Sequence, residues 1–206
     1  MRTLLVPMAG RSKRVPDLRP KWQLTHPMTN RFMVTEAILG LNLDFFDNIY
    51  FICLQEHEDK YHFMKGFVAE LDELGLRSKS NIVLLPEQTR SQSETVYTFL
   101  KGYELEGFVF IKDSDGFYRC DVEERNQVAY FDLNDMDNIN AKAKSYVELD
   151  INNVLTNIVE KKVISSTFSS GGYGFADAKE FCSTYEQLED MEGECYISHV
   201  VFEMML

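Results

Sequence analysis

The stretch Thr3-Leu-Leu-Val-Pro-Met-Ala-Gly10 decides the fold class of this 206-residue chain. Its apolar residues predict a buried strand over 3–8, and the small residues Ala9 and Gly10 predict a sharp loop directly after it. Apolar runs predict three further strands, over 48–54, 81–85 and 107–112. Periodic patterns predict helices between them, over 33–41, 57–74 and 93–103. Strands that alternate with helices in this way indicate a parallel sheet covered on both faces.

The pattern changes after Asp115. Short strands without regular intervening helices are expected over 127–132, 145–150, 154–161 and 172–175, and helices over 177–188 and 196–206. We therefore expect an α/β fold with a mostly parallel Rossmann-like sheet and a mixed C-terminal half, in a single domain spanning 1–206. Because the sequence stops inside an apolar helix, we also expect a longer protein to continue beyond Leu206.

The composition limits the classes of partner. The formal net charge of -12 argues against nucleic acid, because no bulk positive field exists to neutralise a phosphate backbone. The apolar runs are too short to span a bilayer and the N-terminus lacks the apolar core of a signal peptide, so we expect a cytoplasmic protein that binds no membrane. The four cysteines are scattered without a Cys-x-x-Cys pair, which indicates reduced thiols rather than disulfides or a zinc site.

One cationic segment stands out in this acidic chain, since the first 21 residues hold six basic side chains and a single acidic one. Open α/β sheets bind ligands beyond the carboxyl ends of their strands, so the loop after the first strand is the expected phosphate site. The backbone of Met8, Ala9 and Gly10 can approach an oxyanion closely. Arg14 and Lys21 can supply side-chain charge to it. A solvated basic loop is the alternative interpretation.

Two carboxylates, Asp113 and Asp115, directly follow the strand predicted over 107–112. Alternate residues near a strand end point the same way, so both can reach one cation. Mg²⁺ takes one or two carboxylates and fills its shell with waters and substrate phosphates, which makes Asp115 a candidate metal ligand. An Asx-turn at a strand end is an equally good interpretation of the two acids taken alone.

Short motifs spread along the chain resemble the nucleotidyltransferases of the sugar-phosphate pyrophosphorylase and phosphocholine cytidylyltransferase type. They are Pro7-Met-Ala-Gly-Arg-Ser-Lys-Arg-Val15, Pro20-Lys21, Gln88-Thr-Arg-Ser-Gln-Ser-Glu-Thr95, Asp113-Ser-Asp-Gly-Phe117, Glu160-Lys161, Gly171-Gly-Tyr173 and Gly193-Glu-Cys-Tyr196. Each motif is weak alone, and their ordered recurrence carries the resemblance. It implies a GT-A-like fold with a nucleotide-binding half over 1–116 and an acceptor-binding half over 117–206.

The resemblance also implies a role for individual residues. These are Arg14 and Lys21 as catalytic cations, Met8, Ala9, Gly10, Gln88, Ser91 and Asp113 as nucleotide ligands, Asp115 as the Mg²⁺ ligand, and Glu160, Lys161 and Gly172 as acceptor ligands. The implied reaction joins the nucleoside monophosphate of CTP, UTP or dTTP to a sugar 1-phosphate or a phosphocholine-like acceptor and releases pyrophosphate. The base, the acceptor and the oligomeric state, including a homo-oligomer, stay open.

Several positions depart from the pattern of that family. Ser12 and Ser91 stand where glycine is usual, and Lys13 replaces a small hydroxyl residue. If those positions need a positive φ, serine costs stability or shifts the loop. No match to the family's second metal carboxylate occurs before Leu206.

Two other functions therefore stay open. The first is a glycosyltransferase that uses Asp113-Ser-Asp115 as a D-x-D site for a nucleotide-sugar. The second is a non-catalytic, nucleotide-binding regulatory domain, which the serines and the missing carboxylate favour. The cationic loop with Arg14 and Lys21 favours the nucleotidyltransferase, because a glycosyltransferase has no γ-phosphate to hold.

Overall fold

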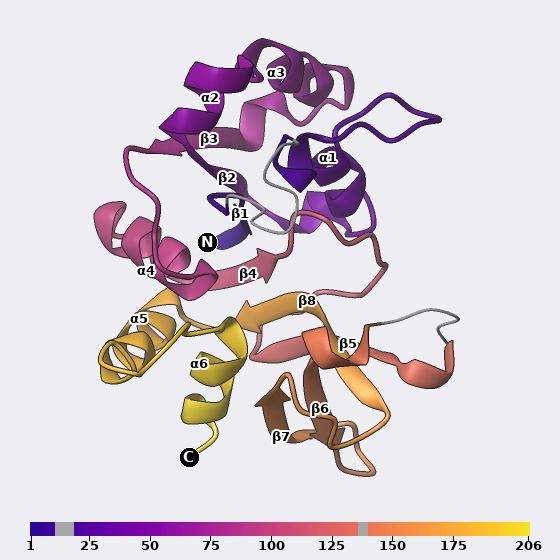
Figure 1. Cartoon of the computed structure of the whole chain (residues 1–206), viewed down its shortest axis with the longest axis vertical. Helices are drawn as coiled ribbons and strands as arrows, with labels where there is room; N and C mark the ends of the chain where they lie inside the picture. Colours follow the sequence, from indigo (N-terminus) through magenta and orange to yellow (C-terminus); the bar gives the residue numbers. More distant parts are fainter. Residues whose placement is uncertain (11–18, 136–139) are drawn as a thin grey trace.

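A computed structural model describes residues 1–10, 19–135 and 140–206 of the chain. One eight-stranded sheet runs through both halves in the order β3-β2-β1-β4-β8-β6-β7, with β5 paired to β8 (Figure 1). The strands are β1 (Arg2–Pro7), β2 (Asn48–Leu54), β3 (Ser80–Leu85), β4 (Phe108–Lys112), β5 (Gln127–Asp132), β6 (Ser145–Leu149), β7 (Leu155–Glu160) and β8 (Thr167–Phe175). The α-helices are α1 (Met33–Ile38), α2 (Gln55–Tyr61), α3 (Met64–Glu73), α4 (Gln92–Gly102), α5 (Ala178–Gln187) and α6 (Ile197–Met204). The short 3-10 helices are η1 (Lys21–Gln23), η2 (Leu43–Phe45), η3 (Arg77–Lys79), η4 (Leu133–Asp135) and η5 (Ala141–Ala143).

The two halves of the sheet differ in strand direction. In the first half β1 pairs in parallel with β2 and β4, and β2 pairs in parallel with β3. In the second half β8 runs antiparallel to β4, β5 and β6, and β6 runs antiparallel to β7. The expected α/β fold, with a mostly parallel first half and a mixed C-terminal half, is confirmed. The strand predicted over 172–175 is longer than expected, because β8 begins at Thr167.

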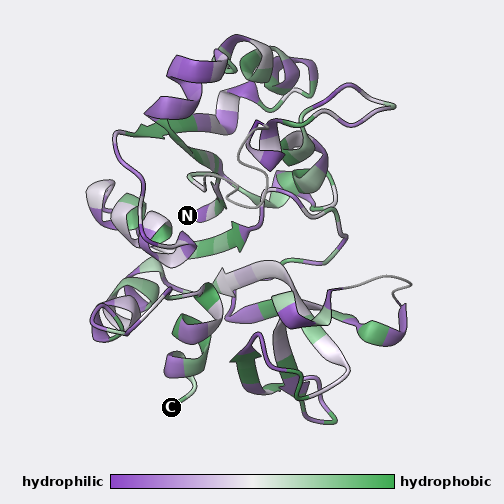
Figure 2. Ribbon diagram, in the orientation of Figure 1, coloured by the Kyte–Doolittle hydropathy of each residue, from purple (hydrophilic) through white to green (hydrophobic). Residues whose placement is uncertain are grey.

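Helices cover both faces of the parallel half, because the residues of each strand alternate between two apolar clusters. Leu5 of β1 packs in the cluster that contains Val96 of α4, and its neighbours Leu4 and Val6 pack in the cluster that contains Phe67 of α3. β4 is buried along its whole length, and Figure 2 shows it coloured as hydrophobic over most of that length. A strand buried on both faces is the expected result of an uninterrupted apolar run.

The single helix predicted over 57–74 is wrong, because the structure has two helices there. The chain turns at His62, whose φ of 50° lies in the left-handed region. Phe63 then packs edge-on against Trp22, with ring centroids 4.8 Å apart. The carboxylate of Glu58 accepts a hydrogen bond of 2.9 Å from the backbone N–H of Met64, which supports the start of α3. Burial of the Phe63 ring therefore accompanies the break.

Two glycines let the second half pack closely against the first. At Gly171, with a φ of +86°, an added Cβ would lie 2.1 Å from Asp113 Oδ2. At Gly172 it would lie 2.9 Å from Cζ of Phe110 in β4 and 2.0 Å from the hydroxyl oxygen of Tyr118. The backbone of β8 thus runs directly beneath the loop that follows β4. Within the described residues, no helix has the length and apolar character needed to span a bilayer.

Candidate functional site

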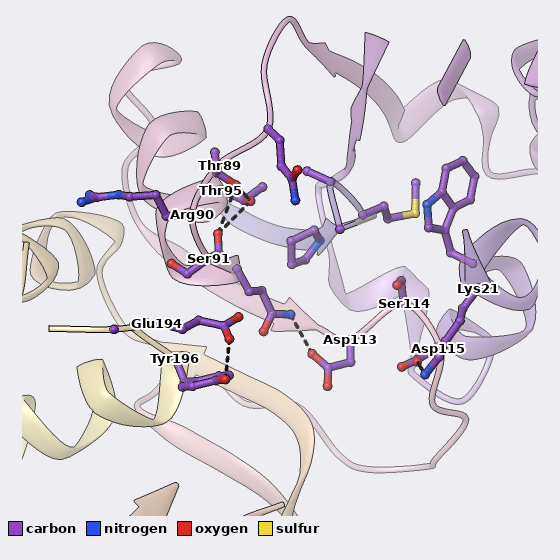
Figure 3. A pocket seen from close by; sticks show the side chains of 18 of the residues that line it. Lys21, Thr89, Arg90, Ser91, Thr95, Asp113, Ser114, Asp115, Glu194 and Tyr196 are labelled. Carbon is purple, nitrogen blue, oxygen red and sulfur yellow. Dashed lines mark hydrogen bonds and ion pairs between the residues drawn. The ribbon is translucent and has the colours of Figure 1, made fainter. Parts of the chain in front are cut away.

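A pocket with a volume of ≈ 800 Å³ opens beyond the carboxyl ends of β1 and β4 (Figure 3). Its walls come from the loop after β1, from η1, from the segment before α4, from the loop after β4 and from the segment before α6. The predicted site residues that line it are Met8, Ala9, Gly10, Lys21, Gln88, Ser91, Asp113, Asp115 and Lys161. Residues from both predicted halves therefore share one pocket.

Three predicted site residues do not line the described part of this pocket. Arg14 lies outside the described residues. The carboxylate of Glu160 accepts hydrogen bonds from the hydroxyls of Ser145 and Ser198, the latter at 2.7 Å, and so joins β7 to β6 and α6. Gly172 lies within β8, where its missing side chain makes room for the ring of Tyr118. The structure thus gives Glu160 and Gly172 packing roles of their own.

The loop after β1 is anchored at one end and open at the other. The backbone N–H of Met8 donates to the carbonyl of Ile52 at 2.7 Å, which extends the pairing of β1 with β2. Met8 and Ala9 are buried, whereas an added Cβ at Gly10 would meet no atom within 4 Å. The chain therefore passes from the core into open space at the point where a phosphate group is expected.

Lys21 and Asp115 join the N-terminal segment to the loop after β4. The ammonium group of Lys21, in η1, lies 3.0 Å from Asp115 Oδ2 (Figure 3). Both side chains are partly exposed, at 44% and 39%, so a ligand can reach them and solvent weakens their attraction. A cation and an anion that both border the pocket can meet a phosphate and a metal ion respectively.

Asp113 lies deeper than Asp115. Burial raises the pKa of Asp113, and the hydrogen bond of 2.7 Å from Gln92 Nε2 opposes that rise. Gln92 is the first residue of α4, so this bond ties the loop after β4 to the start of that helix. The two carboxylates therefore differ in their surroundings. That of Asp113 is enclosed and accepts a hydrogen bond from the Gln92 amide, whereas that of Asp115 pairs with Lys21 at the pocket surface.

Lys112, the last residue of β4, is a feature of the site that the sequence analysis missed. Its side chain is fully buried, and its ammonium group donates to the backbone carbonyls of Asp113, at 2.8 Å, and Gly116. It also lies 4.2 Å from the ring centroid of Tyr118. Burial lowers the pKa of Lys112 to about 8, against the opposing influence of Asp113 and Asp115. A lysine that ends an otherwise apolar strand is the signal that could have identified it.

The segment before α4 is fixed by hydroxyl groups. Ser91 is the N-cap of α4, and its Oγ accepts a hydrogen bond of 3.1 Å from the backbone N–H of Glu94. The carbonyl of Ser91 accepts from the hydroxyls of Thr89 and Thr95, each at 3.1 Å. The φ of Ser91 is -151°, so this position does not need glycine. The strain that a positive φ would bring is absent at Ser91.

Lys161 contacts Tyr196, which Figure 3 shows across the pocket from Lys21. Its ammonium group contacts the hydroxyl of Tyr196 and lies 4.0 Å from the centroid of that ring. The Tyr196 hydroxyl in turn donates to the carboxylate of Glu194 (Figure 3). Glu194 and Tyr196 occur in the motif quoted from the sequence, and the structure adds both to the pocket lining. A lysine held in this way is ready to meet an anionic ligand.

The two aspartates fit the requirements of Mg²⁺ rather than those of a cage built from protein alone. Among the described residues, no group of three or more His, Cys, Asp or Glu side chains is arranged to hold a metal. Mg²⁺ needs only one or two carboxylates when substrate phosphates and waters complete its shell. Asp115 and Asp113, on one loop at the pocket wall, offer that number.

The chain is similar to known proteins in its structure. No protein-family model and no curated protein sequence matches the chain. The nucleoside-diphosphate-sugar pyrophosphorylase from Vibrio cholerae RC9 is similar in structure, with a TM-score of 0.72 and 18% identity, over 100% of this chain and 87% of that one. The inositol-1-phosphate CTP transferase from T. maritima has a TM-score of 0.71 and 15% identity, over 98% and 80% of the two chains.

A third solved structure is a putative glucose-1-phosphate thymidylyltransferase from Bacillus anthracis. It has a TM-score of 0.74 and 16% identity, over 97% of this chain and 81% of that one. All three proteins are nucleotidyltransferases by their descriptions. The chain therefore has the fold of these nucleotidyltransferases, as the ordered motifs of its sequence predict.

Proposed function

We propose that the protein is a nucleotidyltransferase that joins the nucleoside monophosphate of CTP, UTP or dTTP to a phosphorylated small molecule and releases pyrophosphate. A sugar 1-phosphate, inositol 1-phosphate and phosphocholine are the acceptors that the sequence resemblance and the similar structures suggest. The observation that carries this proposal is the shared pocket. Lys21, Asp115 and Lys161 come from motifs far apart in the sequence, yet all three line it.

The proposed chemistry places few demands on proton transfer. An oxygen of the acceptor phosphate is already anionic at neutral pH, so its attack on the α-phosphorus needs no general base. The new P–O bond forms as the bond to pyrophosphate breaks, and the enzyme must mainly align the groups and compensate charge. Two unit charges 4 Å apart repel by about 4 kcal/mol at an effective dielectric near 20, so cations beside each phosphate matter greatly.

In this proposal, different residues of the pocket would bind the triphosphate, the acceptor phosphate and the metal ion. Lys21, which lines the pocket together with Gly10, would bind the triphosphate, and Arg14 is the further cation that the sequence suggests there. Lys161, which lines the same pocket, would bind the acceptor phosphate. Asp115 and Asp113 would hold Mg²⁺, which when bound neutralises negative charge on the triphosphate.

Pyrophosphate release tests this proposal directly. The protein is incubated with Mg²⁺ and each of CTP, UTP, dTTP, ATP and GTP, with and without glucose 1-phosphate, inositol 1-phosphate or phosphocholine. We expect release from one pyrimidine nucleotide that depends on one acceptor. If no combination releases pyrophosphate, the proposal fails.

A D-x-D glycosyltransferase is the second candidate, because Asp113 and Asp115 both line the pocket. Such an enzyme would transfer sugar from a nucleotide-sugar and would release no pyrophosphate from a triphosphate. A non-catalytic domain would bind a nucleotide, detected by thermal shift, without turning over either substrate. The pyrophosphate panel, extended by nucleotide-sugars and by thermal shift as a binding readout, therefore separates the three functions.

Asp115→Asn tests the metal role within that assay. We expect at least a roughly 100-fold loss of pyrophosphate release, because the acceptor's attack loses charge compensation on the triphosphate. The unfolding temperature should stay near that of the wild type, since Asp115 is exposed at the pocket surface. Asp121→Asn, at an exposed acid outside the pocket lining, is the matched control and should keep its activity. Full activity of Asp115→Asn would remove the metal assignment.

A further inference from the structure

The ammonium group of Lys112 is enclosed by protein. The side chain has 0% exposure and sits at the last position of a strand whose other residues are apolar. Lysine is almost never fully buried unless its charge is satisfied, because desolvation of an ammonium group is costly. The contacts that compensate this burial therefore indicate what the residue does.

Those contacts are with backbone and with an aromatic face, not with a carboxylate. Lys112 Nζ donates to the carbonyl of Asp113, at 2.8 Å, and to that of Gly116, and it lies 4.2 Å from the ring centroid of Tyr118. Three partners match the three N–H donors of an ammonium group. Among the described residues, no carboxylate lies within ion-pair distance of Lys112.

The two carbonyls bracket the loop that carries both aspartates. Asp113 opens it and Gly116 closes it, so Asp115 lies between two points that Lys112 holds. The side chain of Asp113 is further restrained by Gln92 and by the close approach of Gly171. Asp115, by contrast, is partly exposed and pairs with Lys21 at the pocket surface.

We propose that Lys112 is a positioning residue, an internal cation that fixes the loop of residues 113–116 and thereby presents Asp113 and Asp115 to a divalent metal ion in one arrangement. This inference rests on the proposed function, which supplies the metal ion. Lys112 itself does not touch the metal ion or the substrate. An apolar residue at this position would complete the core of β4 equally well, but it would leave two carbonyls without their donor.

Metal binding provides a test that does not depend on turnover. The probe is Mn²⁺, titrated by electron paramagnetic resonance in the presence of the α,β-methylene analogues of CTP, UTP and dTTP. Lys112→Met removes the ammonium group and keeps most of the stem. Val109→Ala, at another fully buried position of β4, is the control for loss of core stability alone. Lys112→Leu, which also lacks a donor and resembles the other apolar residues of β4, replaces Lys112→Met if circular dichroism shows that the latter is unfolded.

We expect the Lys112 variant to bind Mn²⁺ about 10- to 100-fold more weakly than the wild type, the range found when groups that hold metal ligands are removed. Val109→Ala should bind Mn²⁺ as the wild type does. Equal Mn²⁺ affinity in the wild type and in the folded Lys112 variant would overturn the positioning role while leaving the proposed function intact. A wild type that binds no Mn²⁺ with any analogue would instead overturn the proposed function, and the positioning role with it.

Discussion

Ser91 stands where the sequence resemblance leads one to expect glycine, and its side chain caps α4. The backbone of Ser91 is extended, and its hydroxyl accepts a hydrogen bond from the backbone N–H of Glu94. A serine N-cap satisfies one of the unpaired N–H groups at the start of a helix, which glycine cannot do with a side chain. Serine in place of glycine at position 91 therefore stabilises the segment that borders the pocket.

The cap predicts a graded loss of stability. Ser91→Ala should lower the free energy of unfolding by about 1 kcal/mol, and Ser91→Gly by only a few tenths, because glycine tolerates the N-cap position better than alanine. Urea denaturation of the three proteins measures both values. A larger loss for Ser91→Gly than for Ser91→Ala would contradict the assignment of Ser91 as the cap.

Glu70 is a second residue with a measurable signature, because it joins α3 to the start of α1. Burial raises its pKa above the ordinary value of 4.5, although the hydrogen bonds from Thr35 Oγ1, at 2.7 Å, and from the backbone N–H of Phe32 lower it. A raised pKa means that, between its unfolded and folded values, the folded protein binds more protons than the unfolded one. Stability then falls as pH rises through that window.

Glu70→Gln tests this sign. Glutamine does not ionise, so the variant should lack the pH-dependent contribution of Glu70 to the free energy of unfolding. The free energy of unfolding of the wild type should therefore fall relative to Glu70→Gln as the pH rises from about 4 to 7. Denaturation of both proteins across that range measures the difference. A wild type that gains stability relative to the variant over the same range would reverse the conclusion.

At the scale of elements, the strands were easier to predict than the helices. The apolar runs of β1, β2 and β4 are buried on both faces, so each could be read from a continuous stretch of sequence. No pattern in the sequence indicates the break between α2 and α3. It depends on a left-handed backbone at His62 and on packing of Phe63 against Trp22, a contact between distant segments.

The left-handed turn makes its own prediction. A residue with a positive φ is strained unless it is glycine, so His62→Gly should leave the free energy of unfolding unchanged or raise it by up to about 1 kcal/mol. Lys60→Gly, an exposed position inside α2, should lower it by about 0.5–1 kcal/mol. The same new residue thus lowers the free energy of unfolding at position 60 but not at position 62. A comparable loss at both positions in urea denaturation would argue against the left-handed turn.

At the scale of the whole molecule, most of the predicted site residues line the pocket, but the sequence did not show which contacts hold its walls in place. Motif order predicts Lys21, Asp115 and Lys161 for one site, and all three line one pocket, because ligand-facing residues lie where strands end. It did not identify Lys112, whose partners are backbone carbonyls that no sequence pattern displays. Nor did it show that Glu160 is bound by Ser198 of α6, a contact that depends on how the last helix packs.

Lys21 in η1 and Lys161 directly after β7 line one pocket from different elements, so the loss of the two proposed phosphate sites should be separable in the pyrophosphate assay. Lys21→Ala should raise the KM for the nucleoside triphosphate by about 10- to 100-fold, the equivalent of ~1.5–3 kcal/mol for a lost hydrogen bond to a charged group. It should leave the KM for the acceptor within about threefold, a difference of well under 1.4 kcal/mol. Lys161→Ala should show the reverse pattern. Lys162→Ala, the exposed neighbour outside the pocket lining, is the control and should change neither constant. If Lys21→Ala and Lys161→Ala both raised only the KM for the triphosphate, the acceptor would have to bind elsewhere, and the assignment of residues 117–206 as the acceptor half would be wrong.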